Sequence, residues 1–497
     1  MTALRPGTIT SSPASGTPPG TTMPPPASGT PPDTVADAGV PGAGSVRVRA
    51  GSVASVGAGA PVPAGLVRAA ELLGSAESFR SIESLHPTTA SPSAASPSAG
   101  SVGTAGPLPS AGSVRPSAAP PSLGSVRSAG PVVTELRLSA FAAHRGATFR
   151  LGPVTLFTGS GGSGKSSVLR AYEALARLAG GEPLGEVFPD PEGCVPEGAV
   201  ADTQGRRGFR IGCTTDGPVG PVRLDVAVQA EPTLRIVGER LTGGGETLLT
   251  TALRDPGRSM VQAAWHTAGT VPVTRAPLPD DRLGTALLPL RVAGRTEGQL
   301  QVLAAAEQTI VALRSVFSCE PQPSRMRAPV PAGDNRLRRS CDNLAAVLER
   351  TRTQCAQPHA RLVAAARAGW TRPVTALGVE PLPDGLVRAV VRREGGGSTP
   401  LSRLGDSELR YLAHALVLLV GPGVLAVDAV GEVPSALQTL TVLADGLDRD
   451  LDGRQLHGLL DLAVSVAATG HIGLVGTVTE RGAFGAGETA GVTVVDL

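Results

Sequence analysis

Hydrophobic and polar residues follow two different periods along residues 131–497, and each period predicts one kind of element. The segment Val154–Phe157 is a short run of apolar and β-branched residues, which is typical of a buried strand. The segment after it repeats its apolar residues at helical spacing, at Val168, Ala171, Leu175 and Leu178. A buried strand therefore leads into an amphipathic helix through a glycine-rich connection.

Similar runs extend this pattern along the chain. Further strands are predicted at Val132–Leu138, Ala147–Leu151, Val424–Val427 and Ile472–Val478. Residues 185–320 begin with strand-rich segments separated by glycine turns, which favours an antiparallel layer. Helical spacing recurs in residues 302–317 and 342–370, and another helix is expected after Asp406. We expect an α/β protein with a doubly wound sheet, an antiparallel layer and a helical insertion.

Composition changes this picture for the first 130 residues. Gly, Pro, Ala and Ser fill 83 of the 130 positions, so this segment has too little bulky apolar surface to offset its ordering entropy. We therefore predict a disordered N-terminal arm at 1–130. The rest is predicted to form one domain at 131–497, with an N-lobe at 131–300, a helical insertion at about 300–370 and a C-lobe at about 371–497.

Charge and cysteine content narrow the class of protein. The net charge of +2 gives no global field that favours nucleic acid or membranes. The five cysteines show no C-x-x-C spacing, which is typical of reduced thiols in a cytoplasmic protein. The longest apolar run, Leu412–Val430, is interrupted by Gly421 and Pro422 and is interpreted as a helix followed by a strand. We expect a cytoplasmic protein without a membrane span.

The connection "GSGGSGKSS" after the first buried strand carries the clearest candidate chemistry. Gly159, Gly164, Lys165 and Ser166 satisfy the spacing G-x-x-x-x-G-K-[ST], in the strand–loop–helix context that such a loop requires. In this loop the backbone N–H groups and the helix N-terminus bind phosphates. The predicted nucleotide ligands are Gly159, Gly161, Gly162, Ser163, Gly164, Lys165, Ser166 and Ser167, and Ser166 is also predicted to bind Mg²⁺.

Lysine usage supports this interpretation. The chain has 44 basic residues, and Lys165 is the only lysine among them. A compact ammonium fits between the β- and γ-phosphates, whereas a planar guanidinium is too large for that position. We therefore predict that Lys165 is a catalytic and nucleotide-binding residue. The alternative is a Gly/Ser-rich linker that matches the motif by accident.

Two longer stretches resemble a known class of ATPase. The segments "VVTELRLSAFAAHRGATFRLGPVTLFTGSGGSGKSSVLRAYEAL" and "TPLSRLGDSELRYLAHALVLLVGPGVLAVDAVGEVPSALQ" resemble the first and last parts of ABC-class ATPases of the SMC, RecF and OLD-nuclease branch. In the middle of the chain, the segments "LRIVGERL" and "PQPSRMRAPVPAGDNRLRRSCDNLAAVLERTRTQ" resemble AAA-type core ATP-binding proteins of bacteria. The resemblance covers about 131–497 and implies a P-loop NTPase fold of ABC type that binds ATP and Mg²⁺. It also implies a homodimer that sandwiches two ATP molecules and acts on a protein partner or DNA.

The resemblance assigns roles to residues of the C-lobe. Asp428, after the expected strand Val424–Val427, takes the place of the acid that holds the Mg²⁺ shell. The family has a glutamate base directly after this acid, but here that residue is Ala429. Glu432, further along the same loop, is the alternative base. Losing such a base typically lowers the rate by a factor of about 10²–10⁴, so slow hydrolysis is predicted.

Two other family positions depart from the pattern. The signature motif has a serine and a glycine where this chain has Gly405 and Ser407, although the helix after it is expected to be capped by Asp406 or Ser407. Ser407 is therefore the candidate contact to the γ-phosphate of a partner subunit. The switch histidine expected after the last strand is replaced by Thr479.

The sequence leaves open the roles of one glutamine and of a group of arginines. Gln204 lies near the expected position of a Q-loop glutamine, and an ordinary surface glutamine is the favoured interpretation. Five arginines are clustered in sequence, at Arg325, Arg327, Arg336, Arg338 and Arg339. They are candidates for nucleic-acid phosphates, but a solvated face or an acidic partner is favoured because aromatic residues for base stacking are scarce. The leading prediction is an Mg-ATP-binding protein with slow hydrolysis; the alternatives are a non-hydrolysing nucleotide-gated scaffold and a DNA-repair or defence ATPase.

Overall fold

The computed structural model describes residues 130–268, 272–427, 438–479 and 490–497. All of these residues lie in one compact unit, within Val114–Leu497. The N-terminal arm predicted at 1–130 lies almost entirely outside the described residues.

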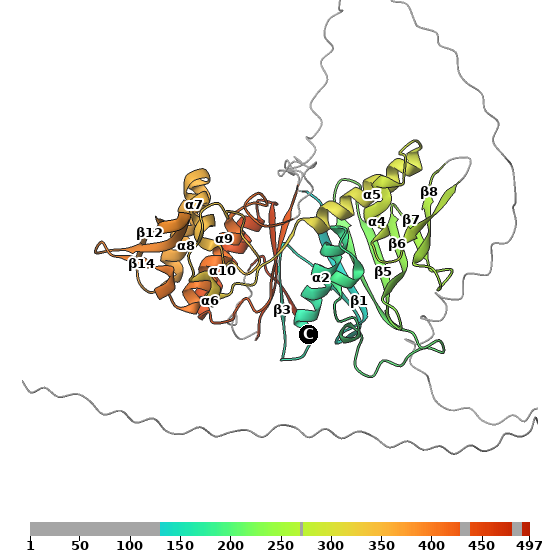
Figure 1. Ribbon diagram of the computed structural model, residues 1–497, viewed down its shortest axis with the longest axis horizontal. Coiled ribbons are helices and arrows are strands. Elements are labelled where there is room, and N and C mark those ends of the chain that lie inside the picture. Colours follow the sequence, from blue (N-terminus) through green and yellow to red (C-terminus); the bar gives the residue numbers. More distant parts are fainter. Residues whose placement is uncertain (1–129, 269–271, 428–437, 480–489) are drawn as a thin grey trace, which may run out of the picture. The chain divides into compact units, whose positions relative to one another are not determined.

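The N-terminal half of this unit is built on an antiparallel sheet of eight strands, in the order β2-β1-β4-β5-β6-β7-β8-β9. Its strands are β1 (Val132–Phe141), β2 (His144–Arg150), β4 (Arg207–Asp216), β5 (Val222–Glu231), β6 (Arg235–Gly243), β7 (Glu246–Ala252), β8 (Met260–His266) and β9 (Val273–Pro279). Consecutive strands from β4 onward pair with their sequence neighbours, so this part is a meander (Figure 1). The predicted antiparallel layer is confirmed.

A second sheet of five parallel strands carries the glycine-rich loop, in the order β10-β15-β16-β3-β17. Its strands are β3 (Val154–Thr158), β10 (Val316–Ser318), β15 (Leu440–Ala444), β16 (Ile472–Thr477) and β17 (Thr493–Asp496). All five residues of β3 and all five of β15 are buried, as expected for central strands covered on both faces. The carboxyl ends of β3, β15 and β16 meet at one edge of this sheet.

Helix α2 (Lys165–Ala179) begins directly after the glycine-rich loop and packs with α5 (Glu297–Arg314). The predicted apolar face of α2 is confirmed, because Val168, Ala171, Leu175 and Leu178 are all buried. These side chains share one hydrophobic core with residues of the antiparallel sheet and with Phe157, Leu443 and Val475 of the parallel sheet. Helix α2 therefore lies between the two sheets, which fixes the loop at its N-terminus.

Short helical turns connect these elements. They are α3 (Leu184–Val187), η1 (Glu192–Cys194), α4 (Gly284–Leu287), η2 (Leu288–Leu290), α6 (Pro323–Met326), η3 (Pro383–Gly385) and η4 (Leu401–Arg403). The buried carboxylate of Glu239 on β6 accepts hydrogen bonds from the N–H groups of Gly284 and Thr285 at the start of α4. This carboxylate caps a buried helix end, and burial raises its pKa.

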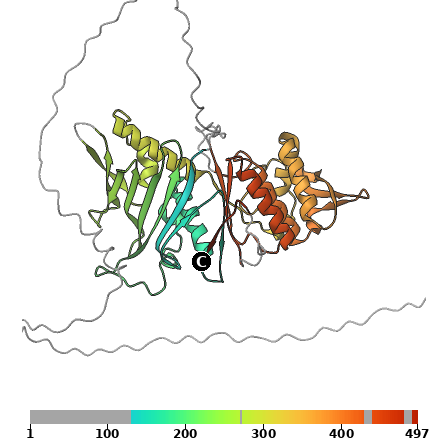
Figure 2. The same ribbon diagram turned by 180° about the vertical axis from the view of Figure 1, so that it is seen from behind.

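The opposite face of the parallel sheet is covered by a third group of elements (Figure 2). Helices α7 (Leu344–Gln354) and α8 (Ala356–Gly369) pack on a small sheet of β11 (Val330–Pro331), β12 (Val374–Pro381), β13 (Leu386–Arg393) and β14 (Ser398–Pro400). Helices α9 (Asp406–Leu419) and α10 (Gly453–Ala467) complete the same core. Within the region expected to be a helical insertion, α5 instead belongs to the core around α2.

One predicted strand is wrong. The segment Val424–Val427 forms a turn with a single β-bridge, from Leu425 to Leu337, and does not join the parallel sheet. The strand beside β16 is instead β15, which is a second short apolar run. Hydrophobic periodicity does not distinguish between two such runs, and the Gly421–Pro422–Gly423 turn keeps the first one outside the sheet.

Candidate functional site

The glycine-rich loop between β3 and α2 has the backbone that close phosphate approach requires. Gly159 has φ 143° and Gly164 has φ 99°, both in the region that side chains disfavour. A Cβ on Gly159 would lie 2.6 Å from the carbonyl oxygen of Leu497, and a Cβ on Gly164 would lie 2.6 Å from His144 Nε2. Only glycine fits at these two positions, because both the backbone angle and the neighbouring atoms exclude a side chain.

Lys165 is the first residue of α2, and its ammonium group folds back over the loop. Its Nζ donates hydrogen bonds to the carbonyl oxygens of Gly159 and Ser160, at 2.6 and 2.9 Å. Ser163 Oγ is buried without a hydrogen-bond partner among the described residues. A positive charge and an unpaired hydroxyl therefore line the same short loop.

The loop also offers free backbone donors. In the part of the chain that the structure describes, no acceptor lies opposite the N–H groups of Gly161, Gly162 and Gly164. The first turn of α2 adds the N–H groups of Lys165 and Ser166, together with the positive end of the helix dipole. This donor set fits the phosphates of a nucleotide, whereas the N–H of Ser167 already donates to the carbonyl oxygen of Gly164 at 2.9 Å.

Ser166 lies opposite a carboxylate that the sequence analysis did not select. Its Oγ donates to Asp445 Oδ1 at 3.0 Å, and Thr477 Oγ1 donates to the same oxygen at 2.6 Å. Asp445 directly follows β15 and Thr477 ends β16, so two adjacent parallel strands bring these groups to the loop. A hydroxyl and a carboxylate at this edge are the oxygen ligands that Mg²⁺ prefers. Ser166 and Asp445 are the residues that would hold the metal.

The other residues predicted for the metal and the base are not among the residues that the structure describes. Asp428, Ala429 and Glu432 are outside the described residues, so the structure does not place them. The position beside Ser166 is taken by Asp445. A signal for this residue was present in the sequence, since "TVLADGLDRDLDG" is an apolar run that ends in an acid and precedes a helix.

The residue after Asp445 is Gly446, so no side chain directly follows the acid that lies beside Ser166. Asp448, further along the same turn, accepts a hydrogen bond from the N–H of Thr479 at 2.7 Å. Its second oxygen is buried without a described partner. The turn after β15 is therefore tied to the turn after β16, where the switch histidine was expected.

A glutamine does lie near this edge, but it is not Gln204. Gln204 is exposed in a turn, where its N–H donates to Asp202, so the interpretation as a surface residue is confirmed. Gln322 follows β10 at the neighbouring strand end. It lines a cavity of about 580 Å³ together with Asp445, Arg449 and Asp406. Its place after an apolar run, "SVFSCEPQ", was the signal that would have identified it.

Helix α9, the predicted signature helix, begins at Asp406 near the same cavity. The expected cap by Asp406 or Ser407 is wrong, because the N-cap is Gly405, whose N–H donates to Glu408 Oε2 at 3.1 Å. Ser407 is partly buried, and its Oγ accepts a hydrogen bond from Gln455 of α10 at 3.4 Å. The structure therefore places Ser407 beside α10, and a contact with a partner's nucleotide remains a prediction.

Most of the clustered arginines are neutralised within the chain. Arg325 pairs with Asp342, Arg327 with Asp406, Arg338 with Asp334, and Arg339 with Glu173 and Glu320. Arg336 is the member for which the described residues supply no ion pair. These pairs explain the cluster as local structure, so the cluster gives no support to a phosphate-binding surface.

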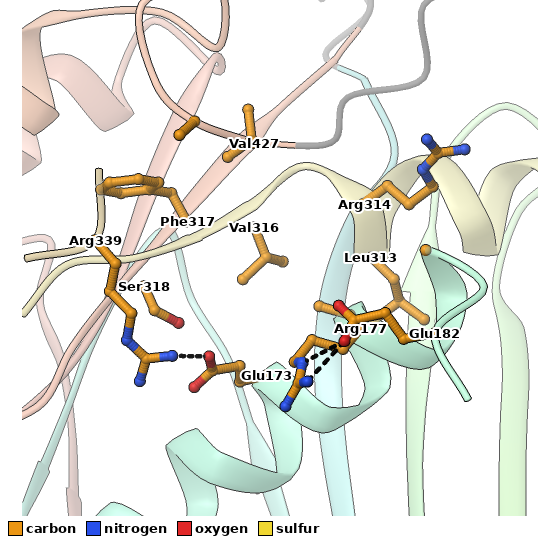
Figure 3. A pocket seen from close by; sticks show the side chains of 13 residues that line it. Glu173, Arg177, Glu182, Leu313, Arg314, Val316, Phe317, Ser318, Arg339 and Val427 are labelled. Atoms are coloured by element: carbon orange, nitrogen blue, oxygen red, sulfur yellow. Dashed lines mark hydrogen bonds and ion pairs between the residues drawn. The ribbon is translucent and has the colours of Figure 1, made fainter. Parts of the chain in front are cut away.

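A smaller cavity of about 270 Å³ lies behind the loop helix (Figure 3). Arg339 and Glu173 form an ion pair on one side of it, and Arg177 and Glu182 form another on the opposite side. Both carboxylates of the lining are therefore paired with an arginine, and much of the remaining lining is apolar. These two carboxylates are not free to bind a cation.

No protein-family model matches the chain, and no curated protein matches it. Similar solved structures include an SmcHead bound to the C-winged helix domain of ScpA, at 11% identity and TM-score 0.41, covering 70% of this chain and 90% of that chain. The SMC head domain from Thermotoga maritima is 13% identical, with TM-score 0.34 and the same coverage. An Smc head domain with an extended coiled coil, bound to the C-terminal domain of ScpA derived from Pyrococcus furiosus, is 10% identical with TM-score 0.36, covering 71% and 90%. These similarities are distant, so the site is interpreted from its own geometry.

Two further observations concern the described residues only. None of their helices combines the length and the hydrophobicity needed to cross a lipid bilayer. They contain no group of three or more His, Cys, Asp or Glu side chains placed to hold a metal ion. A metal ion held at Asp445 would therefore need phosphate oxygens and water to complete its shell.

Proposed function

We propose that this protein binds Mg-ATP through an ABC-type P-loop core. The observation that carries the proposal is the joining of Ser166 to Asp445 at the carboxyl edge of the parallel sheet, next to a loop with free N–H donors and Lys165. In this arrangement the loop and Lys165 bind the phosphates, and Ser166 and Asp445 hold the metal. Bound Mg²⁺ would neutralise part of the negative charge on the phosphates.

We further propose that hydrolysis is slow. Gly446 has no side chain with which to orient a water molecule, and Thr479 replaces the histidine that the family resemblance implies. Lys165 and the metal ligands act on charge rather than on the water, so turnover is lowered without being abolished. The same observation favours a second candidate, a scaffold in which nucleotide binding alone drives dimerisation.

The test is nucleotide binding by the full-length protein, measured by calorimetry with and without Mg²⁺. We expect MgATP to bind wild type and to lose most of its affinity for Lys165→Ala. Sedimentation with a non-hydrolysable ATP analogue then tests the proposed homodimer, and turnover separates an ATPase from a scaffold. Failure of wild type to bind any nucleotide would refute the proposal.

A further inference from the structure

The charges around the Asp445 cavity are mostly cancelled by ion pairs. Arg327 pairs with Asp406, and Arg410 pairs with Asp450 while also donating to the carbonyl oxygen of Pro321. Glu320 is paired with Arg339. These groups hold the cavity wall together and leave no net charge for a ligand to meet.

Two charges on the cavity wall stand apart from these pairs, Asp445 and Arg449. Asp445 accepts hydrogen bonds from the hydroxyls of Ser166 and Thr477, and neither of these groups carries charge. Arg449 is exposed, and no carboxylate of the described residues lies within ion-pair distance of its guanidinium. Among the described residues, the cavity thus presents one anion without an ionic partner, Asp445 at the proposed metal position, and one cation without an ionic partner, Arg449.

The guanidinium of Arg449 occupies the space beside Gly446. A Cβ placed on Gly446 would lie 3.2 Å from Arg449 Nη2 and 3.3 Å from its Nε. The backbone turn that brings the two residues together is closed by a hydrogen bond from the N–H of Arg449 to the carbonyl of Gly446, at 3.0 Å. The space beside Gly446, next to Asp445 in the chain, is therefore occupied by a cation.

We propose that Arg449 binds the terminal phosphate of the bound nucleotide and makes the site select a nucleoside triphosphate over a diphosphate. This inference rests on the proposed function, since it needs a nucleotide on the loop and a metal at Ser166 and Asp445. A guanidinium presents a planar fork of donors that matches phosphate oxygens, and its charge does not depend on pH. A diphosphate lacks the group that this fork would contact.

The experiment measures the affinity of full-length wild type, Arg449→Ala, Arg449→Lys and Arg361→Ala for a non-hydrolysable MgATP analogue and for MgADP. Arg361 is an exposed arginine on α8 and serves as the matched control. For Arg449→Ala we expect the analogue to bind about tenfold to a hundredfold more weakly, the range for loss of a charge-assisted contact. MgADP affinity should stay within about threefold, and Arg449→Lys should recover part of the loss.

The possible outcomes test the role of Arg449 separately from the proposed binding of nucleotide. Loss of triphosphate preference in Arg449→Ala alone supports the inference. Equal weakening of both nucleotides, or no change in either, overturns the role of Arg449 and leaves nucleotide binding intact. Wild type that binds neither nucleotide overturns the proposed function itself, and with it the role of Arg449.

Discussion

Ser166 and Asp445 are 279 residues apart in the chain and are joined by a hydrogen bond of 3.0 Å. Ser166 lies in the strand–loop–helix motif near the start of the described unit, and Asp445 follows the strand β15 near its end. Because β16 separates β3 from β15 in the sheet, the loop and the acid face each other across one strand. This relationship brings the candidate metal ligand Asp445 beside the candidate phosphate-binding loop.

The first prediction concerns Lys165. We expect Lys165→Ala to remove most MgATP binding, because its ammonium is the only cation inside the loop among the described residues. Lys165→Arg should be nearly as harmful, since the guanidinium is too wide for the same position. Calorimetry on the full-length protein measures both, with Arg177→Lys at the other end of α2 as the control. Equal affinity of wild type and Lys165→Arg would contradict the phosphate-loop interpretation.

The second prediction distinguishes two candidate metal ligands. Asp445→Asn keeps the size of the side chain and removes its charge. The factor by which Mg²⁺ increases ATP affinity should therefore be lower than in wild type by about tenfold or more. Asp428→Asn is the matched change at the residue predicted from sequence. If Asp428→Asn alone weakens the Mg²⁺ dependence, the metal assignment to Asp445 is wrong.

Much of the fold was predictable because its elements carry local signals. The strand β3 and the helix α2 were identified by an apolar run and by a repeat at helical spacing, and the structure confirms both. Local signals did not predict that β15, and not Val424–Val427, forms the strand beside β16. Both runs are short and apolar and end near an acid, and only the pairing of β15 with β10 and β16 selects one of them.

In the candidate site, too, some residues could be identified from the sequence and others only from the fold. The loop residues from Gly159 to Ser167 are contiguous, so their spacing alone identified them. Asp445 and Gln322 are brought to the loop by strand order in the sheet, which a single sequence does not specify. Arg449 depends on the turn at Gly446, whose positive φ of 64° allows the side chain to fold back.

The third prediction is a pH dependence of stability. His414 is buried on α9, with Nδ1 3.6 Å from Cys319 Sγ, and burial lowers its pKa to about 4, with the Arg410 charge as a smaller cause. The unfolded chain binds a proton near pH 6.5 while the folded chain does not, so stability is lost as pH falls between these values. Between pH 7 and pH 5 this single group should cost about 2 kcal/mol.

The measurement is urea unfolding of wild type and His414→Leu at the two pH values. Carboxylates also titrate in this range, but their contribution is common to both proteins and cancels in the difference. Wild type should lose more stability than the variant on acidification. An identical loss in the two proteins would show that His414 does not titrate as its burial requires.

The last prediction tests where the missing base belongs. Gly446→Glu places a carboxylate directly after Asp445, and we expect ATP turnover, measured at saturating ATP, to rise by up to about 10²-fold, because a general base contributes about 10²–10⁴-fold. The left-handed backbone at Gly446 costs a non-glycine residue roughly 1–2 kcal/mol, and the flexible side chain of Arg449 must move aside. Gly446→Ala carries the same strain without the carboxylate and is the control.

Ala429→Glu is the matched change after Asp428, and Glu432→Gln removes the alternative base. Higher turnover in Ala429→Glu but not in Gly446→Glu, or loss of wild-type turnover in Glu432→Gln, would place the reacting water beside the Asp428 loop and not beside β15.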